Sequence, residues 1–257
     1  MIKAVTFDLW DTVLLDDSDE PKRAAQGLPP KREARRQLVH EALERQRMSD
    51  GTSGGSIDRR RVDLAYDTTD AAFHRVWYGQ NVTWTVRERL SVLLEGLGRQ
   101  LPDDEFAELV RRHEEMELEI KPDLLPHVQK ALESLRGRYK LGVISDAIFS
   151  PGRVLREILK SYGLYDSFDH LVFSDEAGCS KPAAGMFAAA ARGLGVDVDE
   201  IVHIGDREPK DVAGARSLGA RAILVRIAGD RQPHETEAEA VCDDYRELRN
   251  VLGQIER

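Results

Sequence analysis

Five short apolar runs constrain the fold of this chain more than any other feature of its sequence. Each run is rich in β-branched or aromatic residues, and helical patterns separate the runs. They predict buried strands at 4–7, 139–144, 170–173, 201–204 and 221–227. Strands that alternate with helices are typical of a mostly parallel, Rossmann-like sheet covered on both faces. The sequence therefore predicts an α/β fold.

The first of these strands is cut off from the other four by a long helical region. The region consists of an acidic connection at 16–20 that we expect to be solvated, an amphipathic helix at 31–47, a loop at 48–56, and helices that begin at Asp58, Thr85 and Asp103, the last running to about Ile120. A lone buried strand cannot satisfy its backbone groups, so the first strand must join the sheet of the others. We therefore expect a core domain of residues 1–15 and 121–257 and an all-helical cap domain of residues 16–120.

Charge and composition exclude several classes of function. A formal charge of -9 argues against general nucleic-acid binding, which needs a basic face. The charge permits small phosphorylated substrates, because a local cation can dominate one site. No run is long enough for a membrane span, and the chain enters a strand without a signal peptide. Cys179 and Cys242 give neither a disulfide framework nor zinc spacing, so we expect a cytoplasmic protein. Its oligomeric state cannot be predicted.

Polar residues that suit phosphoryl transfer follow the predicted strands. They are Asp8, Thr12, Ser145, Lys181, Asp206 and Asp211. The carboxyl ends of parallel strands meet at the edge where open α/β sheets bind ligands. A carboxylate nucleophile splits phosphoryl transfer into two easier steps. A hard cation such as Mg²⁺ prefers carboxylate and carbonyl oxygens, while a lysine and a hydroxyl bind the remaining phosphate oxygens.

Each of these residues also has a simpler interpretation. Asp8 and Asp11 are compatible with capping a turn, and Asp211 with favouring a helix N-terminus. Lys181 is expected on an exposed loop, where it is either a surface lysine or a phosphate ligand. The region after the fourth strand also holds Arg207 and Glu208, which point toward the mouth of the same site, with simple solvated charges as the alternative. We expect His203 to be a satisfied core histidine. Trp77, Tyr78 and Trp84 either line the substrate side of the cap or, as is more common for an aromatic cluster, belong to its core.

The ordered set of motifs resembles the haloacid dehalogenase superfamily of aspartate-nucleophile hydrolases. The four motifs correspond to Asp8, Trp10 and Thr12; to Ser145 in the run Gly142–Asp146; to Lys181 in Ser180–Pro182; and to Asp206 with Asp211. The resemblance covers about residues 1–14 and 122–227. The helical block is similar to the family's cap more in its position than in its sequence.

The resemblance implies a magnesium-dependent hydrolase of small phosphorylated compounds that forms an aspartyl-phosphate. The implied catalytic residues are Asp8, Thr12, Ser145 and Lys181; the phosphate ligands are Ser145, Asp146 and Lys181; and the magnesium ligands are Asp8, the Trp10 backbone carbonyl and Asp206, supported from behind by Asp211.

One departure from the family pattern concerns Trp10. Phosphatases of the family carry there an aspartate that protonates the leaving oxygen and then activates water, and indole can do neither. We expect Asp11 to cap the following turn and not to replace this acid. Two alternatives follow: a catalytically weak ligand-binding or regulatory protein, and a 2-haloacid dehalogenase. The family's dehalogenases carry tyrosine at this position and work without metal, but their fourth motif lacks the ligand that Asp206 provides.

Overall fold

The computed structural model describes residues 1–49, 57–229 and 235–256, and a six-stranded sheet forms its centre. The strands are β1 (Ala4–Phe7), β2 (Lys140–Ser145), β3 (His170–Phe173), β4 (Ile201–Gly205), β5 (Arg221–Val225) and β6 (Ala240–Cys242). Their order is β3-β2-β1-β4-β5-β6, and every neighbouring pair is parallel. The predicted α/β class is confirmed, and β1 lies inside the sheet, between β2 and β4.

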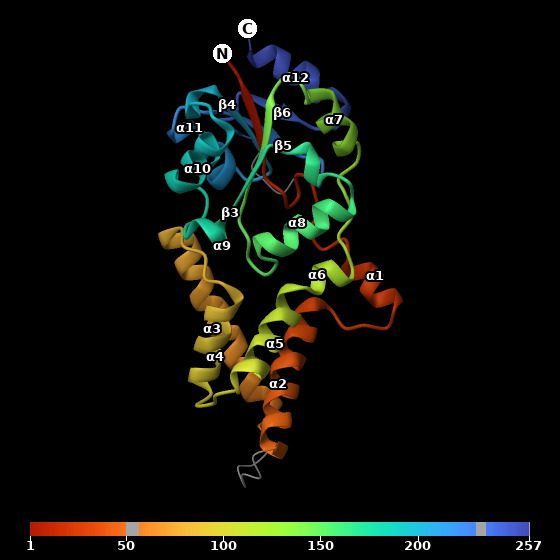
Figure 1. Cartoon of the computed structure of the whole chain (residues 1–257), viewed down its shortest axis with the longest axis vertical. Helices are drawn as coiled ribbons and strands as arrows, with labels where there is room; N and C mark the ends of the chain where they lie inside the picture. The colour runs from red at the N-terminus through yellow and green to blue at the C-terminus, as the bar shows by residue number, and fades with distance from the viewer. Residues whose placement is uncertain (50–56, 230–234, 257) are drawn as a thin grey trace.

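Helices cover both faces of this sheet (Figure 1). They are α7 (Val128–Leu135), α8 (Gly152–Ser161), α9 (Ser174–Ala177), α10 (Ala184–Leu194), α11 (Ala213–Ser217) and α12 (Leu248–Ile255), with short helical turns at Tyr165–Ser167, Val198–Glu200, Glu208–Val212 and Tyr245–Glu247. Because side chains alternate along a strand, those of β1 pack into the hydrophobic cores on both faces of the sheet. Val5 and Phe7 pack with α7, α8 and α12, whereas Ala4 packs with α10 and α11.

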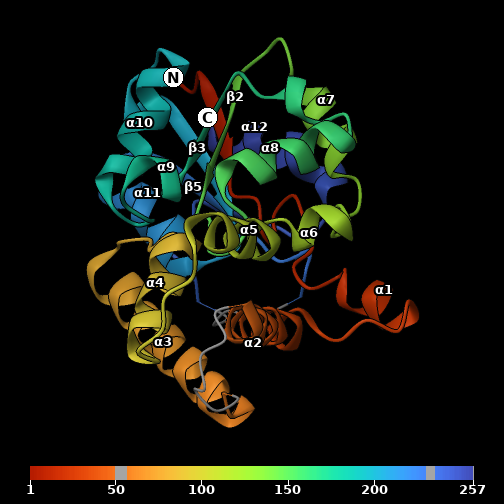
Figure 2. The ribbon, with the colours of Figure 1, turned by 60° about the horizontal axis from the view of Figure 1, so that its bottom comes forward.

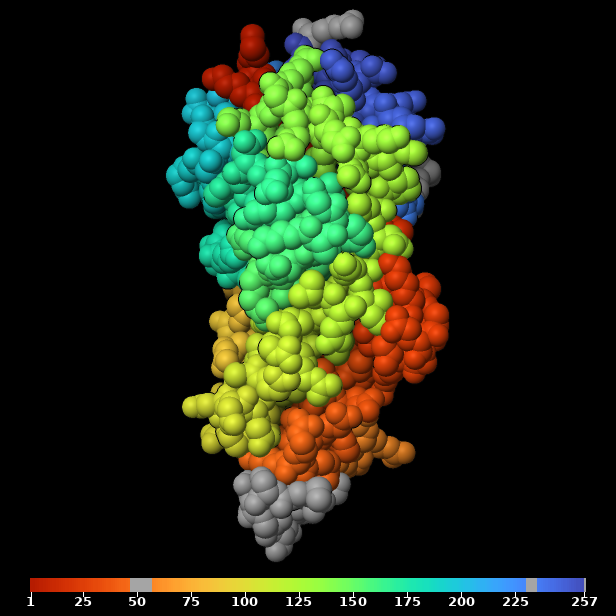
Figure 3. Space-filling view, turned by 45° about the vertical axis from the view of Figure 1, so that its right-hand side comes forward, coloured from red at the N-terminus to blue at the C-terminus, as the bar shows by residue number. Residues whose placement is uncertain are grey.

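The remaining helices form a separate layer at the carboxyl end of the strands. These cap helices are α1 (Glu20–Ala25), α2 (Lys31–Ser49), α3 (Arg59–Gln80), α4 (Val86–Gly96), α5 (Asp103–Glu114) and α6 (Met116–Glu119). They have a hydrophobic cluster of their own. Both chain ends lie at the opposite end of the molecule (Figure 1), and Figure 2 brings the cap helices forward. On the face shown in Figure 3, α6 packs against α8 and joins the two layers.

Local capping explains where two of these helices begin. The Thr85 side chain accepts a hydrogen bond from the Glu88 backbone N–H, and Glu88 accepts one from the Thr85 N–H, so the predicted capping box is confirmed. Asp58 caps α3 by accepting from the Arg60 N–H at 3.0 Å. Among the described helices, none combines the length and the hydropathy that a membrane crossing requires.

Several sequence-based expectations about elements were wrong. Helix α1 and strand β6 were not predicted, because their sequences are short and carry no clear apolar pattern. The helix expected from Asp103 to Ile120 is interrupted at Glu115. The first two residues of the predicted loop 48–56 end α2, and residues 50–56 lie outside the described residues. The connection 16–20 is not fully solvated, because Asp19 is completely buried and accepts a hydrogen bond from Lys31 at 2.7 Å.

A buried histidine in α5 makes the stability of the protein depend on pH. His113 is fully buried, and burial, together with the cations Arg35 and Arg89, lowers its pKa to about 3. In the unfolded chain its pKa is about 6.5, so below that pH the unfolded state binds a proton that the folded state refuses. Between about pH 6.5 and 5 the unfolding free energy should therefore fall by about 2 kcal/mol through this residue.

Urea unfolding of the wild type and of His113→Gln at several pH values measures this effect. The variant cannot take up the proton, so its stability should depend less on pH over this interval. Equal pH slopes in the two proteins would contradict the assignment.

Candidate active site

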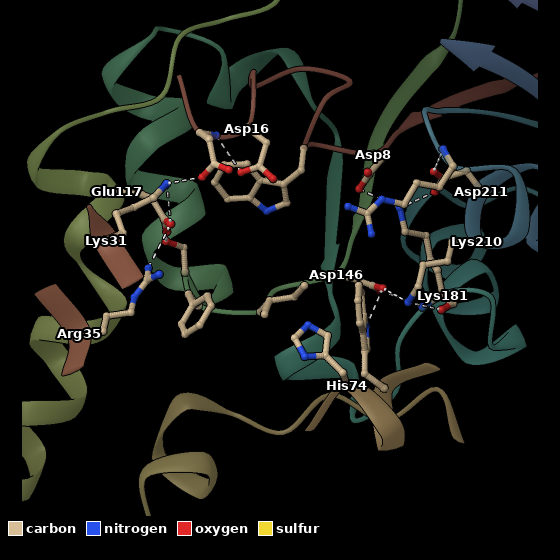
Figure 4. A pocket seen from close by; sticks show the side chains of 17 residues that line it. Asp8, Asp16, Lys31, Arg35, His74, Glu117, Asp146, Lys181, Lys210 and Asp211 are labelled. Atoms are coloured by element: carbon tan, nitrogen blue, oxygen red, sulfur yellow. Dashed lines mark hydrogen bonds and ion pairs between the residues drawn. The ribbon is translucent and has the colours of Figure 1, made fainter. Parts of the chain in front are cut away.

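A cavity of about 250 Å³ lies between the carboxyl edge of the sheet and the cap helices (Figure 4). The core lines one side of it with Asp8, Asp146, Lys181, Lys210 and Asp211, and the cap helices line the other with Lys31, Arg35, His74, Trp77 and Glu117. Asp8 directly follows β1 and Asp146 directly follows β2. The cavity therefore lies where the sequence placed the site.

Lys181 holds two of the predicted acids together. Its Nζ lies 2.8 Å from Asp8 Oδ1 and 2.6 Å from Asp211 Oδ1. Burial opposes the charge of the lysine, but Asp211 and Asp8 outweigh burial and raise its pKa. The expectation of an exposed loop lysine is wrong, because the residue is only 2% exposed. The pairing with two carboxylates from different strand ends explains this burial.

Asp211 pairs with Lys181 and is itself hydrogen-bonded by other protein donors. Its Oδ1 accepts a hydrogen bond from His203 Nε2 at 3.1 Å, and its Oδ2 accepts one from the Arg207 N–H at 2.9 Å. Burial opposes its charge, yet Lys181 and His203 lower the pKa of the carboxyl. His203 is the satisfied core histidine that was predicted, with Nδ1 2.9 Å from Thr6 Oγ1. Both oxygens of Asp211 are thus engaged by protein donors.

Asp8, Asp206 and Asp211 form an acidic cluster that suits a divalent cation. Each offers an oxygen within 4.8 Å of the others. Burial raises the pKa of Asp8, and burial with the charges of Asp211 and Asp8 raises that of Asp206 to about 8. Asp206 Oδ1 is buried and has no hydrogen-bond partner within the described part of the chain. Three crowded carboxylates with one unpartnered oxygen are the donor set that a hard cation stabilises.

The two predicted hydroxyl residues lie at the same edge of the sheet but beneath the cavity surface. Ser145 Oγ and Thr12 Oγ1 are buried, and neither has a partner among the described residues. Neither side chain belongs to the described lining of the cavity. The Thr12 carbonyl accepts a hydrogen bond from the Tyr245 hydroxyl at 2.6 Å, which fixes the loop after β1. The contact of Ser145 with phosphate and the catalytic role of Thr12 stay predictions.

The carboxylate of Asp146 is already occupied by three donors. Its Oδ1 accepts from the Lys181 N–H at 2.9 Å, and its Oδ2 accepts from Trp77 Nε1 at 3.1 Å and from Lys210 Nζ at 2.8 Å. A carboxylate has no hydrogen to donate to phosphate. The side chain therefore holds the Lys181 segment in place, and the predicted contact between Asp146 and phosphate stays a prediction.

Sequence reasoning missed Lys210 on the core side of the cavity and Lys31, Arg35, His74 and Glu117 on the cap side. Arg207 was placed at the mouth of the site with a solvated charge as the alternative, and Trp77 was left open between the substrate side and the core of the cap; both line the cavity. Arg207 Nε lies 3.8 Å from Asp206 Oδ2. The available signal was the position of Arg207 and Lys210 directly after β4, between the two aspartates of the fourth motif. For Trp77 the sequence held no signal beyond its aromatic character.

The structure places an indole where the family's acid would lie. Trp10 is half-buried and lines the cavity beside Asp8. Asp11 adopts a left-handed backbone with φ 53°, is 2% exposed, and accepts a hydrogen bond from the Asp16 N–H at 3.1 Å. It does not belong to the described lining of the cavity. The prediction that Asp11 caps the turn is confirmed.

Replacing Lys181 with methionine should destabilise the fold. The change leaves Asp8 and Asp211 buried without their shared cation, and breaking a buried pair in this way lowers the unfolding free energy by about 3–5 kcal/mol. Urea unfolding measures the loss, with Lys130→Met at an exposed position of α7 as the matched control. A loss as small as that of the control would show that the ion pairs do not stabilise the protein.

Comparisons with known proteins agree with this geometry. The family model of haloacid dehalogenase-like hydrolases matches residues 2–219. A glyceraldehyde 3-phosphate phosphatase of Methanopyrus kandleri is 28% identical over 263 residues, which cover 99% of each chain. The pyrimidine 5'-nucleotidase YjjG of Escherichia coli is 30% identical over 50% of this chain and 56% of its own.

Solved structures with the same fold carry two kinds of names. A phosphatase from Thermococcus onnurineus has a TM-score of 0.63 and 25% identity, and covers 98% of both chains. A 2-haloacid dehalogenase from Pseudomonas syringae has the same TM-score of 0.63 and 24% identity, over 99% of this chain and 100% of that one. The fold is thus shared by both activities. Because the family model matches most of its length and the motif residues Asp8, Trp10, Lys181 and Asp211 line one cavity, the chain belongs to the haloacid dehalogenase-like hydrolases.

Proposed function

We propose that this chain is a magnesium-dependent hydrolase of small phosphorylated compounds, with Asp8 as its nucleophile. The observation that carries the proposal is the arrangement of Asp8, paired with Lys181 and clustered with Asp206, at a cavity. The name of the full-length relative, a phosphatase of a small phosphorylated sugar derivative, supports it. The proposal includes a core domain of residues 1–15 and 121–257 and a cap domain of residues 16–120.

The reaction proceeds in two displacements at phosphorus. A carboxylate oxygen of Asp8 attacks phosphorus, and the bond to the leaving oxygen breaks with its electron pair, so that this oxygen takes up a proton from solvent water. Water then attacks phosphorus, the bond to Asp8 breaks, and inorganic phosphate leaves with the carboxylate restored. Lys181 stabilises the charge on the phosphate oxygens, and Ser145 donates a hydrogen bond to them.

The magnesium ion would be held by Asp8, the Trp10 backbone carbonyl and Asp206. Asp211 would support these ligands from behind. When bound, magnesium supplies positive charge for the phosphate oxygens. Asp206→Asn should therefore weaken magnesium binding by more than about tenfold, because even groups that only support a metal ligand have effects of this size. Calorimetric titration measures the affinity, and Asp104→Asn on α5 is the control. Unchanged affinity in Asp206→Asn would place the ion elsewhere.

A panel of phosphate esters, assayed with magnesium and with a chelator, tests the activity. We expect magnesium-dependent release of phosphate that Asp8→Asn abolishes. The same panel should include a 2-haloacid, because release of halide in the presence of the chelator would establish the dehalogenase alternative instead.

Trp10 favours a second candidate, a weak family member that serves as a binding or regulatory protein. Because Trp10 is not an acid, the chain has no general acid at the position in the cavity where the family's phosphatases carry one. Tight phosphate binding with turnover no faster than that of Asp8→Asn would support this candidate against the phosphatase.

A further inference from the structure

We propose that Lys210 is a positioning residue that couples docking of the cap helices to the placement of Lys181. The inference deepens the proposed function, on which its kinetic test rests. One chain of contacts runs from Trp77 in α3, through Asp146 and Lys210, to the backbone of Lys181.

The ammonium group of Lys210 is buried and contacts other residues of the protein. Its Nζ donates to Asp146 Oδ2 at 2.8 Å and to the Lys181 carbonyl at 3.1 Å, and lies 3.5 Å from the centre of the Trp77 ring. The residue is 5% exposed. An ammonium has three N–H groups, and here two donate to oxygens while the cation lies against an aromatic face. Lys210 is therefore suited to fixing its neighbours and not to binding phosphate directly.

Asp146 and Lys210 together hold both sides of the Lys181 backbone. Asp146 Oδ1 accepts from the Lys181 N–H at 2.9 Å, while Lys210 donates to the Lys181 carbonyl. The backbone of the lysine that pairs with Asp8 is thus fixed by one ion pair. That ion pair in turn contacts the cap, because Trp77 Nε1 donates to Asp146 Oδ2 at 3.1 Å.

The segment that follows Trp77 makes two further contacts to the same part of the core. The Asn81 carbonyl accepts from the Ser180 N–H at 2.8 Å, next to Lys181. Thr83 Oγ1 donates to Ser174 Oγ at 2.7 Å, and this oxygen also accepts from the Ala147 N–H at 2.9 Å, next to Asp146. The cap helices therefore cannot separate from the core here without releasing the residues beside Lys181 and Asp146.

A double-mutant cycle with Lys210→Met and Trp77→Phe tests the coupling. Phenylalanine keeps one aromatic ring but loses the N–H together with the second ring of the indole, and methionine keeps a similar length and removes the charge. The measured quantity is the affinity for inorganic phosphate in the presence of magnesium. We expect losses of about tenfold for Lys210→Met and about threefold for Trp77→Phe. The double variant should lie within about twofold of Lys210→Met, because both changes break one connected network.

The control variants remove polar groups that make none of these hydrogen bonds, and Tyr78→Phe keeps the ring that lies 5.4 Å from Lys210 Nζ. Tyr78→Phe removes a hydroxyl from the neighbouring aromatic residue, which is 60% exposed, and Lys130→Met removes an exposed lysine. Both should bind phosphate as the wild type does. Multiplicative losses in the cycle, or full affinity in Trp77→Phe, would overturn the proposal.

Two further measurements separate positioning from direct binding. With nitrophenyl phosphate, Lys210→Met should lower kcat more than it raises KM, and a rise in KM at unchanged kcat would make Lys210 a phosphate ligand and overturn the proposal. If Lys210→Met does not fold, Thr83→Val breaks the docking from the cap side, and it too should weaken phosphate binding. Unchanged binding there would overturn the proposal. If no ester is hydrolysed at all, the proposed function is wrong. The double-mutant cycle on phosphate affinity still tests the coupling between Lys210 and Trp77.

Discussion

Asp8→Asn is expected to lower the hydrolysis of phosphate esters by at least about a thousandfold, because removing a nucleophile costs more than removing most other catalytic groups. Asparagine has nearly the same shape, so the cavity and its other residues should be unchanged. Initial rates with nitrophenyl phosphate and magnesium measure the loss. A variant that keeps more than a tenth of the wild-type rate would show that Asp8 is not the nucleophile.

The same substitution should leave the stability unchanged or increase it. Burial raises the pKa of Asp8 in the folded state, so the ionised carboxylate is disfavoured there relative to the unfolded chain. Stability is therefore lost through this residue as the pH rises above its unfolded pKa of about 4, and asparagine removes that loss. Lys181 keeps Asp211 as a partner.

Thermal melts at neutral pH test this second expectation, with Asp104→Asn as the control at an exposed position of α5. A clear drop in melting temperature for Asp8→Asn would mean that the pair with Lys181 outweighs the burial of the charge. The combination of lost turnover and increased stability would show that Asp8 serves the reaction at some expense to the fold.

Local sequence signals predicted much of the fold because the strands are buried on both sides. Such strands are short continuous apolar runs, as in 222–225, and the capping box of Thr85 and Glu88 depends only on residues three apart. Helix α1 was missed because its sequence is polar and its position depends on the ion pair between Asp19 and Lys31. Charge pairs between distant residues leave no pattern in a single sequence.

The candidate site likewise has a part that the sequence predicts and a part that it does not. Asp8, Lys181 and Asp211 meet because they follow strands of one parallel sheet, and this geometry could be predicted from the order of the strands. The contact of Trp77 with Asp146 and Lys210 depends on how α3 docks on the core. Nothing in the helical pattern of α3 fixes that docking, so the cap side of the cavity had to be seen in the structure.

Trp10→Asp should increase the hydrolysis of alkyl phosphates by about 10²–10⁴-fold, which is the usual effect of a positioned general acid. Alkyl leaving groups need a proton, whereas nitrophenolate leaves without one. The wild type should therefore hydrolyse nitrophenyl phosphate far better than alkyl phosphates, and the variant should narrow that difference. The measurement is the ratio of kcat/KM for the two substrates, with Trp10→Asn as the control that has a similar size but no acid.

The position of the indole sets the risk of this experiment. Trp10 is half-buried, lines the cavity and packs against the core cluster that contains Val5 and Phe7. Its loss should lower the unfolding free energy by about 1–3 kcal/mol, less than for a fully buried aromatic residue. Thermal melts of both variants must therefore precede the kinetics, and the comparison between aspartate and asparagine cancels the cost of the lost indole.

The pH dependence then distinguishes a new acid from a merely enlarged cavity. A carboxyl group that donates the proton must be protonated, so the gain on alkyl phosphates should fall as the pH rises through the pKa of that carboxyl. Trp10→Asn has no such group and should show no such fall. If Trp10→Asp folds and gains nothing on alkyl phosphates, proton donation does not limit this chain, and the binding or regulatory protein becomes the better account of its function.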